Sequence, residues 1–96
     1  MAAIHRSARA EIDLIEIWTF IARDDPAAAD RQLTRIDTAC RWLAENPHIG
    51  PRREDLAAGL RFYPTGNYLI FYTLLEGGIA IARVIHGARD YPRDFE

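Results

Sequence analysis

The sequence predicts an α+β fold, in which an N-terminal strand and an antiparallel helical hairpin precede a three-stranded antiparallel meander. Apolar residues recur every three or four positions over residues 8–45, which is the period of amphipathic helices. Over residues 60–85 the chain turns to aromatic and β-branched runs separated by glycines, which is typical of strands and hairpins. With 96 residues, we expect one domain spanning 1–96.

The first helix is expected over residues 8–22. Ser7 suits its N-cap, and Glu11, Asp13 and Glu16 fall early in the helix, where acidic side chains favour the positive end of the helix dipole. The apolar residues that mark one face are Ala10, Leu14, Ile17, Trp18 and Ile21. Residues 2–6 are expected to form a short strand before this helix.

The second helix is expected over residues 26–45. Asp25 can cap it, and Pro26 fits the first helical position because that position needs no N–H. Its apolar residues form a narrow seam, namely Ala29, Leu33, Ile36, Cys40 and Leu43. The short turn between the two helices makes them antiparallel.

A loop with one helical turn near 54–58 is expected over residues 46–59. Strands are expected over 60–63, 68–75 and 79–85, with hairpin turns at Gly66-Asn67 and at residues 76–78. Residues 68–72 are apolar on both faces, which indicates a central strand covered by the helices on one side.

The composition excludes several classes of protein. No apolar run approaches the 18 or so residues of a membrane span, and no signal-peptide pattern follows the N-terminus, so a cytoplasmic protein without membrane contact is expected. The formal net charge is −2, with 12 arginines and no lysine. Proteins that bind nucleic acid by general attraction carry a basic excess, so we expect no direct sequence-specific nucleic-acid binding.

No metal or cofactor site is expected. The three histidines (His5, His48 and His86) and Cys40 are far apart in the sequence, without the spacing of zinc ligands, and no glycine-rich phosphate loop is present. Cys40 falls at an apolar position of the second helix and is expected to be a small buried hydrophobe.

The arginines around the sheet are the first candidates for function. Arg61 opens the meander, and Arg83 lies at the rim of an apolar face, where it is either a salt-bridged structural residue or a grip for an anion. His86, at the end of the last strand, is either a general acid or base or, as we favour, a side chain hydrogen-bonded to the backbone. Arg89 follows it.

The tyrosines are a second set of candidates. Tyr63, Tyr68, Tyr72 and Tyr91 are too many for a core of this size. Tyrosine is enriched at protein interfaces, so some of them either belong to a partner groove or pack across strands with their hydroxyls in water.

Several stretches together resemble a known family. They are residues 10–18 (AEIDLIEIW), 43–47 (LAENP) with Gly50 and Arg52, Leu60-Arg61, 68–72 (YLIFY) and 81–90 (IARVIHGARD). Through these stretches and the order of its elements, nearly the whole chain resembles the ParE/RelE superfamily of bacterial type II toxins. The combination of these stretches, ending in RVIHGARD, is more similar to the ParE branch than to the RelE branch.

The resemblance implies a toxin that a co-expressed antitoxin neutralises, the antitoxin being a ParD-like DNA-binding protein whose C-terminal segment wraps the toxin. It implies DNA gyrase as the target in the ParE branch, and mRNA in the ribosomal A site in the RelE branch. The acidic balance and the lack of an identifiable base favour a gyrase inhibitor without catalytic residues. The alternatives are a ribosome-dependent mRNA endonuclease and a non-toxic module that only binds an antitoxin.

These implications assign residues to surfaces. The expected target-binding residues are Arg61, Arg83, His86, Arg89 and Tyr91, and the catalytic set of the endonuclease alternative is Arg61, Arg83, His86 and Tyr91. The expected apolar anchors of the antitoxin are Leu14, Trp18, Trp42 and Tyr68, because a helix bound in a groove needs apolar contacts.

Overall fold

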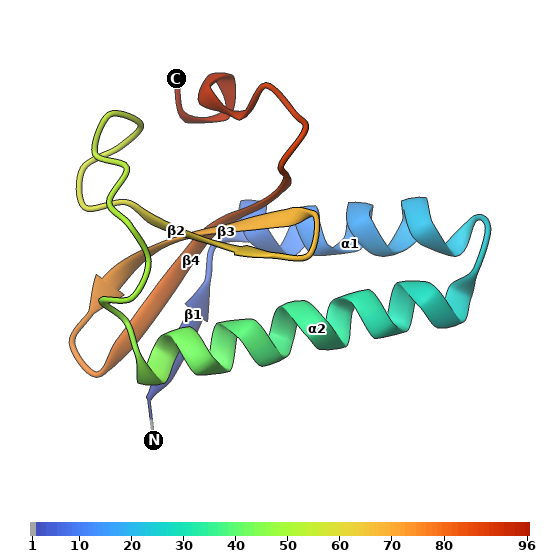
Figure 1. The fold of residues 1–96 in the computed structure, drawn as a ribbon, viewed down its shortest axis with the longest axis horizontal. Helices are drawn as coiled ribbons and strands as arrows, with labels where there is room; N and C mark the ends of the chain where they lie inside the picture. The colour runs from blue at the N-terminus through green and yellow to red at the C-terminus, as the bar shows by residue number, and fades with distance from the viewer. Residues whose placement is uncertain (1) are drawn as a thin grey trace.

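The computed structural model describes residues 2–96, which form two helices packed on a four-stranded mixed sheet (Figure 1). The elements in chain order are β1 (Ala3–Arg6), α1 (Ala8–Ala22), α2 (Pro26–Glu45), β2 (Arg61–Thr65), β3 (Tyr68–Leu75), β4 (Gly78–His86) and a 3₁₀ helix, η1 (Tyr91–Phe95). The strand order is β1-β4-β3-β2, with β1 parallel to β4 and the other pairs antiparallel. The predicted α+β fold with a helical hairpin and a meander is confirmed.

Both helices begin and end where the sequence predicts. The Ser7 hydroxyl oxygen accepts a hydrogen bond from the Ala10 N–H at 3.0 Å, and an Asp25 carboxylate oxygen accepts one from the Ala28 N–H at 3.1 Å. These caps satisfy amide groups that the first helical turn leaves free. Strand β2 is longer than predicted and includes Pro64, which an edge strand tolerates because its outer side needs no donor.

The sheet is covered on both faces. On the helix side, Tyr72 is fully buried; its hydroxyl donates to the Pro47 carbonyl at 2.8 Å and accepts from the Gly50 N–H at 3.0 Å. On the other side, which we call the back face, η1 places Phe95 against Phe71 with ring centroids 4.8 Å apart. Figure 1 shows this C-terminal segment across the sheet from the helices. The tail is therefore part of the fold, which its polar sequence does not indicate.

The tyrosines divide between the core and its margin. Tyr68 and Tyr72 belong to the helix-side core, at 9% and 0% exposure, whereas Tyr63 and Tyr91 are half-buried. Burial raises the pKa of both Tyr68 and Tyr72 above the ordinary value. The core accepts more tyrosine than expected because its inner hydroxyl, that of Tyr72, finds partners in the loop after α2.

The open side of β4 is closed by side chains of α1. Strand β1 pairs with β4 only as far as Ile81, after which the Ser7 hydroxyl donates to the Ala82 carbonyl at 2.8 Å. Asp13 then accepts the Val84 N–H at 3.0 Å and binds the Arg83 guanidinium through two hydrogen bonds of 2.8 and 3.0 Å. Helix α1 thus takes over the hydrogen-bonding role of the missing strand.

The pair of Asp13 and Arg83 is buried. The side chains are 4% and 9% exposed, and Arg83 also lies 3.4 Å from Asp94 of η1. The hydrogen bonds that Arg83 donates to Asp13 raise the pKa of Arg83 above its ordinary value. One guanidinium therefore connects α1, β4 and the tail.

Replacing Asp13 by Ala is expected to destabilise the fold by about 3–5 kcal/mol, because it leaves a buried guanidinium and the Val84 amide without their partner. Asp13→Asn keeps the shape and is expected to cost less. The measurement is urea unfolding followed by circular dichroism.

The matched control is Asp37→Ala, which breaks an exposed ion pair with Arg41 and should change stability by less than about 1 kcal/mol. Equal losses for the Asp13 and Asp37 variants would contradict the central role of the buried pair.

Candidate functional site: a groove beside the helical hairpin

An apolar groove runs between α1, α2 and β1. It consists of two adjoining hollows of about 270 and 310 Å³, which share Arg6, Leu14 and Leu33 in their linings. The deeper hollow is lined on its apolar side by Ile4, Leu14, Leu33, Ile36, Cys40, Ile81 and Val84. The second continues along α1 past Ile15 to Trp18. An elongated apolar channel of this kind fits a helix that presents one apolar face.

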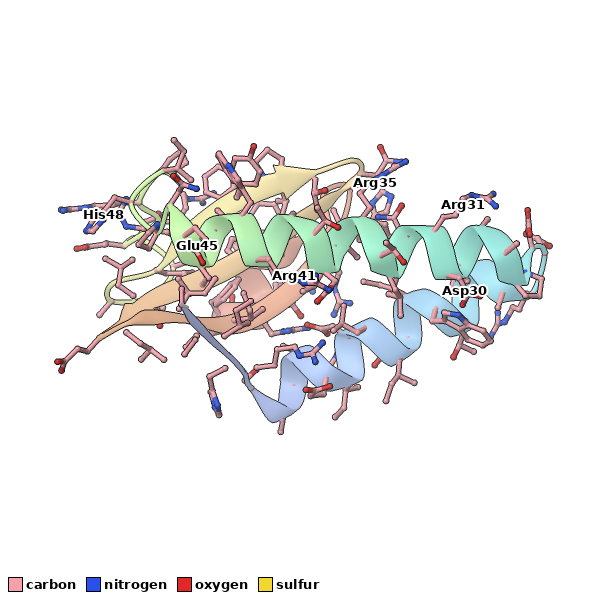
Figure 2. The ribbon with its side chains drawn as sticks, turned by 90° about the horizontal axis from the view of Figure 1, so that it is seen from below. Asp30, Arg31, Arg35, Arg41, Glu45 and His48 are labelled. Atoms are coloured by element: carbon pink, nitrogen blue, oxygen red, sulfur yellow. The ribbon has the colours of Figure 1, made fainter. Side chains whose placement is uncertain are left out.

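Charged side chains form the rim of this groove and are paired with one another. Arg6 lies 3.2 Å from Glu11, and Arg41 pairs with Asp37 across one turn of α2. Figure 2 shows Arg41 on the side of α2 that faces α1, while Arg31 and Arg35 lie on another side of α2. The groove therefore has an apolar floor and a mixed, self-neutralised rim, which favours an occupant that binds by apolar contact.

The free edge of the sheet adjoins the groove. The amide of Ala3 donates to the Gly77 carbonyl just before β4, and that of Ser7 donates to the Ile81 carbonyl of β4. Backbone groups alternate in direction along a strand, so those of Ile4 and Arg6 point away from β4. All four residues of β1 are exposed. This edge can pair with an added extended segment, whereas the outer edge of β2 is blocked by Pro64 and by the Phe62 amide bonding to the Pro51 carbonyl.

The expected antitoxin anchors are not all in this groove. Leu14 and Trp18 line it, and the Trp18 indole N–H donates to Asp30 at 2.8 Å, which ties α1 to α2. Trp42 instead lines a shallow hollow between α2 and β2, with its ring 5.3 Å from that of Tyr63. Tyr68 is buried on β3 behind α1, edge-on to His86 at 5.2 Å.

Two of the expected target-binding residues are buried and bonded within the protein. Arg61 donates to the carbonyls of Gly50 and His48 at 2.7 and 3.0 Å. Arg83 is held by Asp13, so of the two alternatives for this residue the geometry favours the salt-bridged structural role. Neither guanidinium is presented to solvent as a grip for an anion.

The other three candidates lie near the end of β4 and the tail. His86 is exposed, and its Nδ1 accepts the Ala88 N–H at 3.1 Å, which is the backbone-bonded arrangement favoured from the sequence. Arg89 is half-exposed and donates to Asp94 at 2.8 Å. The Tyr91 hydroxyl accepts from Arg53 at 3.2 Å while its ring packs on Phe71.

The proposed catalytic set does not converge on one place. Arg61 pairs with Tyr72, which belongs to the helix-side core, and Arg83 pairs with Phe71, which belongs to the back-face core. Residues paired across antiparallel strands share a face, so the two arginines start from opposite faces of the sheet. Among residues 2–96, no group of three or more His, Cys, Asp or Glu side chains could hold a metal ion.

Several groove residues were not singled out by the sequence. Ile4 and Arg6 come from a strand that is only four residues long, and Leu33 and Ile36 were assigned only to the packing between the helices. The signal in the sequence that could have indicated this site was Ile4, an apolar residue in the short first strand. Asp13 gave a misleading signal, because an acidic residue early in a helix suits the helix dipole as well as a buried ion pair.

Comparison with known proteins identifies the class. The model of the family described as "ParE toxin of type II toxin-antitoxin system, parDE" matches residues 4–91. Two proteins of Caulobacter vibrioides are similar: toxin RelE2, 35% identical over 89 residues (93% of this chain and 99% of that protein), and toxin ParE1, 33% identical over 82 residues (83% of each). Within the type II toxins, the chain belongs to the ParE toxin family.

A solved structure shares the fold. It is described as the chromosomal ParDE TA system from P. aeruginosa and superposes with a TM-score of 0.74 over 90% of this chain and 96% of that one, at 19% sequence identity. Within the described residues, neither helix is long and apolar enough to cross a lipid bilayer.

Cys40 provides a probe of the groove floor. The residue is 6% exposed, and burial raises the pKa of its thiol to about 11. Because the thiolate is the reactive species, alkylation by iodoacetamide at pH 8 should be on the order of a hundredfold slower than in the urea-unfolded chain.

The control for that measurement is an exposed thiol on the same helix, Thr38→Cys combined with Cys40→Ser, which should react rapidly in the folded state. Equal rates for Cys40 in the folded and unfolded chain would show that the groove floor is open to solvent.

Proposed function

We propose that this toxin inhibits DNA gyrase by surface binding and is neutralised by an antitoxin segment in the groove between α1, α2 and β1. The observation that supports inhibition by surface binding is that Arg61 and Arg83 both bond to groups within the protein. Both are bonded to the protein's own carbonyls or carboxylates, from opposite faces of the sheet. A proton-transfer site needs its groups within hydrogen-bond reach of one scissile bond. A protein that only binds its target needs no such convergence.

The surface available for a target lies around the end of β4. His86 and Arg89 line a hollow of about 330 Å³ together with Phe20, whose side chain is 68% exposed. This hollow is formed by the flank of α1 that faces away from the groove. Aromatic residues, Phe included, are enriched at protein interfaces, and arginine is enriched among the residues that carry most of the binding energy.

The groove supports the antitoxin partner. Its apolar floor and neutral rim suit an amphipathic helix, and the adjoining edge of β1 suits an extended segment that follows the helix. The solved structure from P. aeruginosa that shares this fold is described as a ParDE TA system, which supports an antitoxin partner for this chain.

Gyrase inhibition is tested with purified gyrase and relaxed plasmid. The chain should block supercoiling and accumulate cleaved DNA, and should leave mRNA intact in a programmed translation reaction. Arg89→Ala should weaken the inhibition about tenfold, since it removes one exposed contact while Arg83 still holds Asp94.

The matched control for that variant is Arg31→Ala, an exposed arginine of α2 on another side of the molecule (Figure 2), which should inhibit gyrase as the unaltered chain does. Cleavage of mRNA with DNA left intact would instead establish the endonuclease alternative and end the gyrase proposal.

Neutralisation is tested by co-expression with the cognate antitoxin. Ile4→Glu places a charge in the apolar groove and should weaken the complex about 30-fold or more, measured by calorimetry on the purified proteins.

The control is Phe20→Glu, an equally drastic change on the other flank of α1, which should leave antitoxin affinity unchanged. Loss of binding by Phe20→Glu but not by Ile4→Glu would move the antitoxin site to the other flank.

A further inference from the structure

Helix α1 carries a second apolar surface that the groove does not use. Its solvent side presents Ile12 and Ile15, which are 44% and 65% exposed. With their neighbours along the same line they form a seam at spacings of four, three, four and three, which we call the α1 seam: Ala8, Ile12, Ile15, Thr19 and Ala22. Only Ile15 also lines the groove.

The seam lies on the side of α1 opposite the core. Ala10 and Ile17, at 0% and 9% exposure, occupy the positions that a heptad pattern places farthest from such a seam. A helix that is apolar on its core side and on its outer side is typical of one buried on both sides. Figure 2 shows α1 along the lower margin of the molecule, with α2 in front of it and its outer flank uncovered.

The spacing is that of helices that pack side by side. Residues repeating at alternate steps of three and four form the knobs of a coiled-coil interface. Ala8 at one end is small enough for two helix axes to approach closely there. The Thr19 hydroxyl donates to the Ile15 carbonyl at 2.8 Å, so the seam exposes no unsatisfied hydroxyl there.

The seam is complementary to itself about a two-fold axis. In an antiparallel pair centred between Ile12 and Ile15, Ile12 of one copy faces Ile15 of the other, and Ala8 faces Thr19. The same register sets Arg9 beside Glu16 of the second copy, twice by symmetry. Within one chain these two side chains lie 3.4 Å apart, so the contact between copies brings two such ion pairs together with opposite charges adjacent. Opposite charges thus meet along one flank of the seam.

We propose that the α1 seam binds a second copy of this chain, forming an antiparallel, two-fold symmetric dimer. One helix of 15 residues is about 22 Å long and buries less than the roughly 1,600 Å² of a standard interface. The dimer is therefore reversible, with a dissociation constant on the order of 10–100 μM.

The test is sedimentation equilibrium of the purified chain from about 1 to 500 μM. The mass should rise from the monomer value of 10.9 kDa towards twice that value. Ile12→Glu should remain monomeric throughout, because it buries two charges at the two-fold axis, whereas Ile49→Glu, an equally exposed apolar residue after α2, should dimerise normally. A monomeric unaltered chain at 500 μM, or a dimer unchanged by Ile12→Glu, would overturn the proposal.

The charged flank gives a second test. Glu16→Arg should weaken the dimer at least fivefold, since it faces Arg9 of the other copy, while Glu45→Arg on α2 (Figure 2) should not. Ile12→Glu should still bind the antitoxin, because Ile12 does not line the groove. The proposal of a dimer and the proposal of neutralisation in the groove can therefore be contradicted independently of each other.

A crosslink tests the register directly. A chain with Ile12→Cys mixed with one carrying Ile15→Cys should form an intermolecular disulfide on mild oxidation, and Cys40 does not compete because it is buried. A mixture of Ile12→Cys with Phe20→Cys is the control and should not crosslink. Equal crosslinking in both mixtures would overturn the antiparallel register.

Discussion

The buried ion pair of Asp13 and Arg83 joins every layer of this small fold. Asp13 comes from the first helix, Arg83 from the last strand, and Asp94 adds the C-terminal tail at 3.4 Å from the same guanidinium. Asp13 also accepts the Val84 amide, which would otherwise be unpaired where β1 has left the sheet. Such a pair stabilises the fold less than its Coulomb energy suggests, because both charges lose water. The pair nevertheless constrains the geometry strictly, because either charge would be very unfavourable if it were buried without the other.

That pair also decides which arginines are available for function. The chain has 12 arginines, and their density near the end of β4 first indicated a recognition surface. Once Arg83 holds the helix and Arg61 holds the loop after α2, the exposed arginines that remain there are Arg89 and Arg93. The structural arginines position the surface, and the exposed ones can contact a partner.

Helix α1 faces three surroundings at once. One side lies on the sheet, a second forms the groove with α2 and β1, and the third is the α1 seam. This explains a helix that is apolar nearly all round in a chain of ordinary composition. Ile15 belongs to both the groove and the α1 seam. An antitoxin and a second copy of the chain would therefore compete for this one side chain.

The sequence by itself determined the elements and their order. Helix bounds followed from the Ser7 and Asp25 caps and from Pro26, and the hairpins followed from glycine turns, because these signals act within a few residues of chain. It also identified one apolar face of each helix. The family was recognisable from short stretches distributed over the whole chain.

Only the tertiary structure decided how distant residues are used. Asp13 and Arg83 are 70 positions apart, and nothing local distinguishes an acidic residue that favours a helix dipole from one that binds a buried guanidinium. The back-face core likewise needs Phe95 of the tail against Phe71 of β3. The groove is lined by residues of β1 and of both helices, and these residues come together only in the folded protein. Contacts of long sequence separation carry no periodicity, and the packed fold alone brings their partners together.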